Sequence, residues 1–256
     1  MAMKKDVPVS ERATSLYAWY RRPLGRALAE AEHAVLTERL TNLFGYHMLV
    51  VNPPWEQCVL DDSRIAHRVL QSVGPATRPG VDLSANPDQW PIMTDSVDAV
   101  LLPHTLELST NPHQVLREAD RSLIPDGHLV ILGFNPFGPW GLRRLLSRRS
   151  GVLPWGTRFQ SLHRVKDWLE LLGFDTLHSH YLFQRPPVQS QRVLRRLRFM
   201  EPAAGTGHML LSAGYILVAR KRSIVMTPLR DAQRTRKRLF PVGIPSSTQG
   251  NVRRVN

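Results

Sequence analysis

His104 and Glu107 are the side chains of this sequence best placed to move a proton. They follow a largely apolar run at residues 97–102, a pattern that predicts a strand buried on both faces of a parallel sheet. Ligands of such sheets bind beyond the carboxyl ends of the strands, where both side chains are expected. Imidazole titrates near neutral pH, so His104 is a candidate general base. The alternative is that His104 is structural or simply exposed, which is the commoner role of a lone loop histidine.

Other reaction chemistries find little support. His178 and His180 alternate along an expected strand, but no third ligand with suitable spacing is visible, so no metal site is predicted. A Gly-x-Ser-x-Gly elbow, which would present a serine nucleophile, does not occur. Cys58 is the only cysteine, which excludes an internal disulfide and a cysteine-based metal cluster.

The segment around His104 and Glu107 reads as a strand, a helix and a second strand. Asn111 is a suitable N-cap, and Pro112 stands at the first helical position, where an N–H would have no partner. Apolar residues then recur at helical spacing, and the Pro-Asp-Gly sequence at residues 125–127 predicts a turn. A strand is predicted at residues 128–133. This order predicts a right-handed βαβ unit.

This stretch resembles the class I S-adenosylmethionine-dependent methyltransferases, specifically the type 11 group. The matching positions are Asp98, Leu106, Glu107, Asn111, Pro112, Leu116, Glu118, Arg121, Leu123, Pro125 and Gly127. The resemblance implies a doubly wound α/β fold with a mostly parallel, Rossmann-like sheet, closed by an antiparallel strand at residues 214–220. It also implies methyl transfer to an unidentified acceptor, expected to be a small molecule, and a structural role for Asp98. His104 and Glu107 are the catalytic candidates, since a hydroxyl or a protonated amine needs a general base.

S-adenosylmethionine is the cofactor that the resemblance implies. The binding positions expected from it are Val51, Asn52, Ser72, Asn86, Trp90 and Pro103. Asn86 stands where the family has an acid that meets adenine, and its carbonyl oxygen can still accept from an amine. Trp90 can stack on adenine or belong to the core, and both interpretations stay open.

Two parts of the expected cofactor site depart from the family's pattern. The glycine-rich loop after the first strand, here residues 47–51, is replaced by Asn-Pro-Pro-Trp at residues 52–55. The prolines remove backbone donors that such a loop supplies. The acid that ends the second strand and binds the ribose is missing, because residues 63–81 contain no Asp or Glu, so Gln71 or Ser72 must replace it.

The chain is expected to have three parts. Residues 1–44 form a helical extension, with apolar positions at helical spacing over residues 10–44, which either forms a lid on the substrate side or only covers the sheet. Residues 45–222 form the methyltransferase-like domain, with a helix at 162–172 and a strand at 174–181. Residues 223–256 carry seven basic residues and one acid without periodicity, which predicts a basic, disordered tail.

Positive charge is concentrated in the second half of the chain. Residues 1–120 carry 11 Lys and Arg against 15 Asp and Glu, whereas residues 121–256 carry 23 against 6. Residues 141–149 and 191–200 place leucines and arginines at helical spacing on separate faces. With the tail, these basic helices predict a surface for an anionic membrane or RNA, unless the apolar faces dock on the domain and the arginines are only solvated.

Two hypotheses of different classes follow. The chain is either a methyltransferase or a catalytically silent methyltransferase-like domain that binds RNA, a membrane surface or a protein through its basic face. Neither a secretory signal nor an apolar run of about 18 residues is present, which predicts a cytoplasmic protein, with peripheral membrane attachment as an option.

Overall fold

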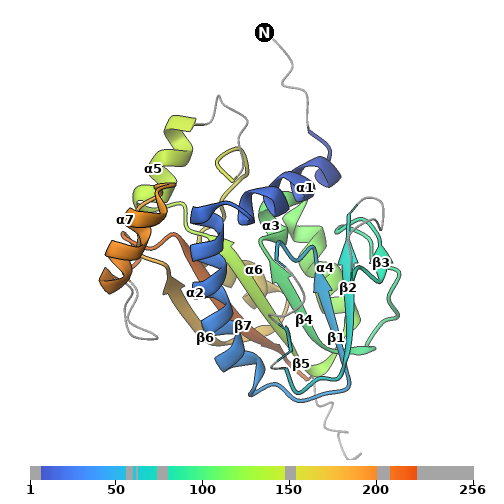
Figure 1. Cartoon of the computed structure of the whole chain (residues 1–256). Helices are drawn as coiled ribbons and strands as arrows, with labels where there is room; N and C mark the ends of the chain where they lie inside the picture. The colour runs from blue at the N-terminus through green and yellow to red at the C-terminus, as the bar shows by residue number, and fades with distance from the viewer. Residues whose placement is uncertain are drawn as a thin grey trace, which may run out of the picture. The chain divides into compact units, whose positions relative to one another are not determined.

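The computed structural model describes residues 7–55, 60–61, 63–73, 80–147, 154–200 and 208–223 (Figure 1). Its centre is a seven-stranded sheet in the order β3-β2-β1-β4-β5-β7-β6. The strands are β1 (His47–Val51), β2 (His67–Ser72), β3 (Leu83–Ser84), β4 (Val97–Pro103), β5 (Leu123–Phe134), β6 (Phe174–Leu182) and β7 (Gly214–Lys221). β7 is antiparallel to β5 and β6, and the other neighbouring pairs are parallel. This is the doubly wound fold expected from the sequence. The predicted tail, apart from Ser223, lies outside the described residues.

Helices cover both faces of this sheet (Figure 1). On one face, α4 (Pro112–Ser122) and α6 (Leu162–Leu171) pack in an apolar cluster with Leu49 and Leu129. On the other face, α1 (Val9–Tyr20) and α2 (Pro23–Leu40) pack in a cluster with Val50 and Leu101. Successive side chains of a strand point to opposite faces, so Leu49 and Val50 belong to different clusters.

The helix predicted after Asn111 forms as expected, but the strand that follows begins earlier. The Asn111 side chain accepts a hydrogen bond from the Gln114 backbone N–H at 3.3 Å. β5 already begins at Leu123, which pairs with Val97, and the pairing resumes at His128 with Ala99. The residues between form a bulge in which Asp126 has a left-handed φ of 63°. The Pro-Asp-Gly sequence therefore bends the strand from within.

The N-terminal helical region is divided in two by a sharp corner at residues 21–22. Pro23 starts α2, and a Cβ on Gly25 would lie 2.4 Å from the carbonyl oxygen of Trp19. Only glycine allows α1 and α2 to approach this closely. α2 ends at Leu40 rather than near residue 44, and the Asn42 side chain donates to the Glu38 carbonyl there.

α2 packs in the same apolar cluster as Trp55, Leu60 and Ile65 of the β1–β2 connection. Parallel strands are usually joined through a helix, yet the described residues between Val51 and His67 form no α-helix. Leu28, Leu36 and Leu40 of α2 are fully buried in the cluster that contains Val50. The N-terminal helices are therefore part of the core.

Two basic helices lie at one end of the molecule (Figure 1). They are α5 (Gly138–Ser147) and α7 (Gln191–Arg196), the latter continued by the 3₁₀ helix η2 (Leu197–Met200). None of the helices in the described part of the chain is long and apolar enough to cross a membrane.

Candidate active site

His104 follows β4 directly and is held in an unusual conformation. Its backbone is left-handed, with φ 55° and ψ 16°, and its N–H donates to the Leu132 carbonyl at 2.9 Å. A left-handed non-glycine residue stores strain and commonly marks a functional position. The side chain is only 1% exposed, so His104 is not the solvent-exposed residue that the sequence left open.

One nitrogen of His104 is fixed by two residues of the N-terminal helices. Nε2 lies 2.8 Å from Oε1 of Glu32 and 2.7 Å from the Tyr20 hydroxyl. Tyr20 also lies 2.9 and 3.1 Å from the two Glu32 oxygens. Burial, followed by the negative charge of Glu32, raises the pKa of Tyr20 well above its usual value, so its hydroxyl keeps its proton and donates. We call these three side chains the His104 cluster.

The proton arrangement in the His104 cluster follows from the donors available. Glu32 can accept but not donate when ionised, so Nε2 carries the proton that points toward its carboxylate. Nδ1 is then an acceptor, and it is buried without a hydrogen-bond partner among the described residues. Buried polar atoms are rarely unpaired, so this nitrogen is a candidate contact for a ligand.

Glu107 lies close by, and its side chain bonds to the backbone at the end of β5. Its Oε1 accepts a hydrogen bond from the Phe134 backbone N–H at 2.8 Å, which ties α3 (Thr105–Leu108) to the end of β5. Oε2 has no partner in the described part of the chain. Burial raises the pKa of Glu107 to about 6, although the nearby His104 opposes the shift. Glu107 thus bonds to the backbone at the end of β5.

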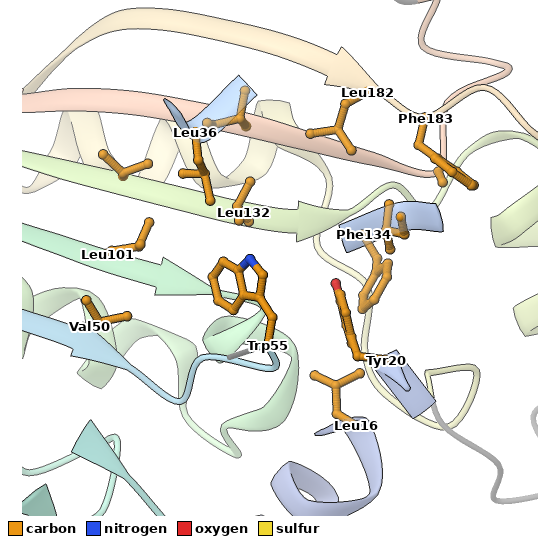
Figure 2. Close-up of a cluster of buried hydrophobic side chains, with 14 of the residues drawn as sticks. Leu16, Tyr20, Leu36, Val50, Trp55, Leu101, Leu132, Phe134, Leu182 and Phe183 are labelled. Atoms are coloured by element: carbon orange, nitrogen blue, oxygen red, sulfur yellow. The ribbon is translucent and has the colours of Figure 1, made fainter. Parts of the chain in front are cut away.

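Aromatic rings enclose the His104 cluster. Phe134 stacks on the imidazole at 4.0 Å between centroids, and Trp19 packs edge-on against both Tyr20 and Phe134. Figure 2 shows Tyr20, Trp55 and Phe134 near the ends of β4 and β5. The indole N–H of Trp55 is buried without a partner among the described residues. The aromatic rings therefore shield the His104 cluster from solvent.

Two predicted cofactor residues at the ends of β1 and β2 carry unsatisfied polar atoms. Asn52 is left-handed, with φ 53°, and its side-chain oxygen accepts from the Val73 N–H at 2.8 Å, while its Nδ2 has no described partner. Gln71 donates to the Asn86 carbonyl at 3.3 Å, and its Oε1 is unpaired. Ser72 is buried beside it. Sequence reasoning placed Gln71 only as a stand-in for the missing acid.

The other predicted cofactor residues lie in varied surroundings. Val51 and Pro103 are buried at the ends of β1 and β4, and the Val51 carbonyl accepts from the Thr105 hydroxyl. Asn86 is exposed on the loop after β3. Trp90 is 5% exposed within the apolar cluster beneath α4, and its indole N–H donates to the Pro87 carbonyl at 2.7 Å. This packing agrees with the core interpretation of Trp90.

Several residues of the recognised motif hold the framework. Asp98 accepts from the backbone N–H groups of Tyr46 and His47, each at 2.9 Å, which is the structural role expected for it. Glu118 and Arg121 pair at 2.9 Å and bond to the backbone of Trp90 from both sides. The motif thereby fixes the loop between β3 and β4.

Sequence reasoning missed Glu32 and Tyr20. The signal for Glu32 was present, because it lies four residues from both Leu28 and Leu36 in the apolar stripe of α2, where a carboxylate needs a partner. Tyr20 gave no comparable signal.

The paired histidines at residues 178 and 180 do not form a metal centre in the described chain. His180 Nε2 lies 2.8 Å from an Arg39 nitrogen. Burial, followed by the positive charge of Arg39, lowers the pKa of His180. The described residues contain no group of three His, Cys, Asp or Glu side chains that could hold a metal.

Comparisons with known proteins agree with the fold. A family model described as a methyltransferase domain matches residues 61–131. The uncharacterized protein YafS of Escherichia coli K12 is 34% identical over 223 residues, which are 87% of this chain and 88% of YafS. A structure from Thermotoga maritima, described as an S-adenosylmethionine-dependent methyltransferase and possible histamine N-methyltransferase, has a TM-score of 0.58 at 18% identity over 84% of this chain and 99% of that one. An S-adenosylmethionine-dependent methyltransferase from Archaeoglobus fulgidus has a TM-score of 0.51 at 13% identity over 74% and 94%.

Proposed function

We propose that this chain, which belongs to the type 11 group of class I S-adenosylmethionine-dependent methyltransferases and to the same family as YafS, methylates a hydroxyl or amine of a small molecule. Family membership supports the methyl transfer. The observation that carries the acceptor chemistry is the unpaired, buried Nδ1 of His104, on a ring whose other nitrogen is held by Glu32.

The ends of β1 and β2 fit the cofactor even though the glycine-rich loop is missing. Asn52 adopts the left-handed backbone that a glycine would otherwise supply. Its Nδ2 is an unpaired donor, and Oε1 of Gln71 is an unpaired acceptor. Hydroxyl groups donate and accept, so a bound nucleoside satisfies both atoms. When bound, S-adenosylmethionine supplies a methyl group that its sulfonium already activates.

His104 acts as the general base in this proposal. Glu32 orients the imidazole through Nε2–H and stabilises the positive charge that develops when Nδ1 takes a proton. A hydroxyl or protonated amine of the acceptor would give its proton to Nδ1, which frees the lone pair that would take the methyl group. The methyl carbon would leave the sulfonium sulfur at the same time, so that S-adenosylhomocysteine would be released. The same roles of carboxylate and imidazole recur in unrelated enzymes.

Burial of His104 supports a small acceptor. The imidazole is 1% exposed, and Tyr20 of α1 and Glu32 of α2, which contact it, are at most 4% exposed. A protein or nucleic-acid strand is too large to reach Nδ1 through this cover, which favours a small molecule as the acceptor. The aromatic walls of Trp19 and Phe134 favour an acceptor with an apolar body.

Calorimetric titration of the full chain with S-adenosylmethionine and S-adenosylhomocysteine tests the cofactor site. We expect saturable binding that Gln71→Met weakens about two- to tenfold, since one hydrogen bond contributes roughly 0.5–1.5 kcal/mol. Gln89→Met, at an exposed position beside the site, is the matched control and leaves the affinity unchanged.

Absence of binding at millimolar cofactor would contradict the proposal. In that case the catalytically silent domain becomes the better hypothesis. If the Gln71→Met variant and the parent bind the cofactor with equal affinity, the chain binds the cofactor but Gln71 does not contact it.

A further inference from the structure

An apolar and basic surface lies at the end of the molecule formed by α5, α7 and the turn at residues 208–212. Its exposed apolar side chains are Leu142 (59% exposed), Leu145 (59%), Leu146 (77%), Phe199 (80%), Leu210 (65%) and Leu211 (44%). We call it the α5–α7 surface. Single exposed leucines are common, but a group of this kind marks an interaction site.

Helix α5 is anchored so that its leucines face outward. Trp140 is fully buried, and its indole N–H donates to the Arg185 carbonyl at 2.9 Å. Leu142, Leu145 and Leu146 recur at helical spacing away from this anchor and remain largely exposed. The leucine face of α5 is therefore unpartnered by the described residues.

The neighbouring turn is attached to the same end. The Asn135 side chain donates to the carbonyls of Met209 and Ser212, at 2.5 and 3.0 Å. A Cβ on Gly138, the first residue of α5, would collide with the Leu210 carbonyl, so the turn packs directly on the start of the helix. These bonds fix Leu210 and Leu211 beside α5.

Helix α7 contributes charge, and its packing agrees with one of the two interpretations that the sequence left open, the docking of its apolar face on the domain. Leu194 is 2% exposed and docked in the core, so it is not available to a partner. The exposed side chains of this segment include Arg192, Arg195, Arg196 and Arg198. The Arg185 side chain donates to the Leu194 carbonyl, which joins α7 to the strand end that anchors α5.

We propose that the α5–α7 surface binds an anionic lipid bilayer. Residues 138–147, 183–200 and 208–213 contain no Asp or Glu, so arginines meet no competing acid on these segments. Exposed leucines enter the acyl boundary while arginines contact anionic headgroups, which is how interfacial helices bind. The charge complementarity selects lipid over other occupants of the apolar face.

The alternative occupants fit less well. A second copy of the chain would bring two arginine-rich faces together, and the segment 224–256, with seven basic residues and one acid, repels the surface too. Single-stranded RNA is bound through several exposed aromatic rings. Among the described residues this end of the chain exposes Phe199 (80%) and Phe137 (45%), and its other exposed apolar side chains are not aromatic.

Co-sedimentation of the full chain with vesicles tests this proposal. We compare phosphatidylcholine alone with phosphatidylcholine mixed with an equal amount of phosphatidylglycerol, and expect binding to the mixed vesicles. Leu142→Gln/Leu145→Gln/Leu146→Gln should weaken that binding on the order of a hundredfold without lowering the melting temperature. Leu171→Gln, at an 85% exposed leucine on α6, is the control and binds as the parent does.

Two single arginine variants test whether the arginines of the α5–α7 surface contribute more to vesicle binding than arginines elsewhere in the chain. Arg196→Gln should weaken vesicle binding about fivefold, whereas Arg117→Gln, at an exposed position on α4, should not. Undiminished vesicle binding by the triple leucine variant would overturn the proposal and assign the binding to charge elsewhere in the chain. RNA binding is measured by fluorescence anisotropy and oligomeric state by light scattering. Loss of RNA binding or of a dimer in the leucine variant, with vesicle binding unaffected, would also overturn the proposal.

Discussion

Removing the Tyr20 hydroxyl tests whether the His104 cluster is a tightly coupled unit. Tyr20→Phe keeps the ring against Trp19 but deletes the group that lies 2.9 and 3.1 Å from the Glu32 oxygens. Glu32 then keeps only His104 as a side-chain partner among the described residues. All three side chains are at most 4% exposed, so water does not replace the lost hydroxyl.

The size of the effect follows from this burial. A hydrogen bond to a charged group contributes roughly 1.5–3 kcal/mol to stability. Tyr20→Phe removes such a bond from buried Glu32, so we expect the free energy of unfolding to fall by about that amount. In a domain of this size, each kcal/mol lowers the melting temperature by about 2–4 °C, so the expected fall is about 3–12 °C. Tyr46→Phe, at an 80% exposed ring, is the control and should leave the melting temperature unchanged.

A double-mutant cycle separates coupling from simple loss of packing. Urea unfolding is measured for Tyr20→Phe, Glu32→Gln and the double variant. The hydroxyl bonds less strongly to an amide than to a carboxylate, so Tyr20→Phe should cost less in the Glu32→Gln background, with a coupling of about 0.5–3 kcal/mol. Additivity within about 0.5 kcal/mol would refute the carboxylate-centred cluster and the His104 tautomer inferred from it.

The remaining predictions concern the base, a buried acid, a docked helix and the corner between α1 and α2. With any acceptor that the protein methylates, His104→Gln should lower the rate about a hundredfold or more and leave calorimetric cofactor affinity unchanged; parallel losses would give His104 a structural role. The pKa of Glu107 is raised from 4.5 to about 6 in the folded state, which therefore binds more protons than the unfolded state between these two pH values. The free energy of unfolding should fall by about 2 kcal/mol as pH rises through this window. Glu107→Gln should remove that slope from urea midpoints measured across it. Leu194→Glu buries a carboxylate and should cost several kcal/mol, whereas Val193→Glu, at a 41% exposed neighbour, should cost little; similar unfolding midpoints would contradict the docking of α7. Gly25→Ala should destabilise more than Gly173→Ala in thermal melts, since a Cβ meets the Trp19 backbone at the first site and open space at the second, where only the φ of +84° opposes it.

The sheet and helix α4 could be predicted because their signals are local. β1 and β4 are short apolar runs buried on both faces, and Asn111 and Pro112 mark the helix start in sequence as they do in space. The bulge in β5 was less visible, because a Pro-Asp-Gly sequence looks the same whether it turns the chain before a strand or within one.

The His104 cluster could not be predicted because its members are far apart in sequence. Glu32 and His104 are separated by 72 residues, and no periodicity connects a carboxylate on one helix with a histidine after a strand. The same limit applies to α7, where spacing placed Leu194 on an apolar face but did not say whether lipid or the core covers it. The packing of the chain decides both questions.

The place of α2 in the core has a consequence for how the chain is made. α2 is complete once residue 40 is synthesised, but part of its apolar cluster, including Val218 of β7, appears only near the end of the described chain. At about 5–20 residues per second, the stripe of Leu24, Leu28, Leu36 and Leu40 waits roughly ten to forty seconds for its full set of partners. Glu32 interrupts that stripe with a charge, which lowers its tendency to aggregate on the ribosome. The carboxylate that orients His104 in the folded protein therefore also protects the nascent helix before His104 exists.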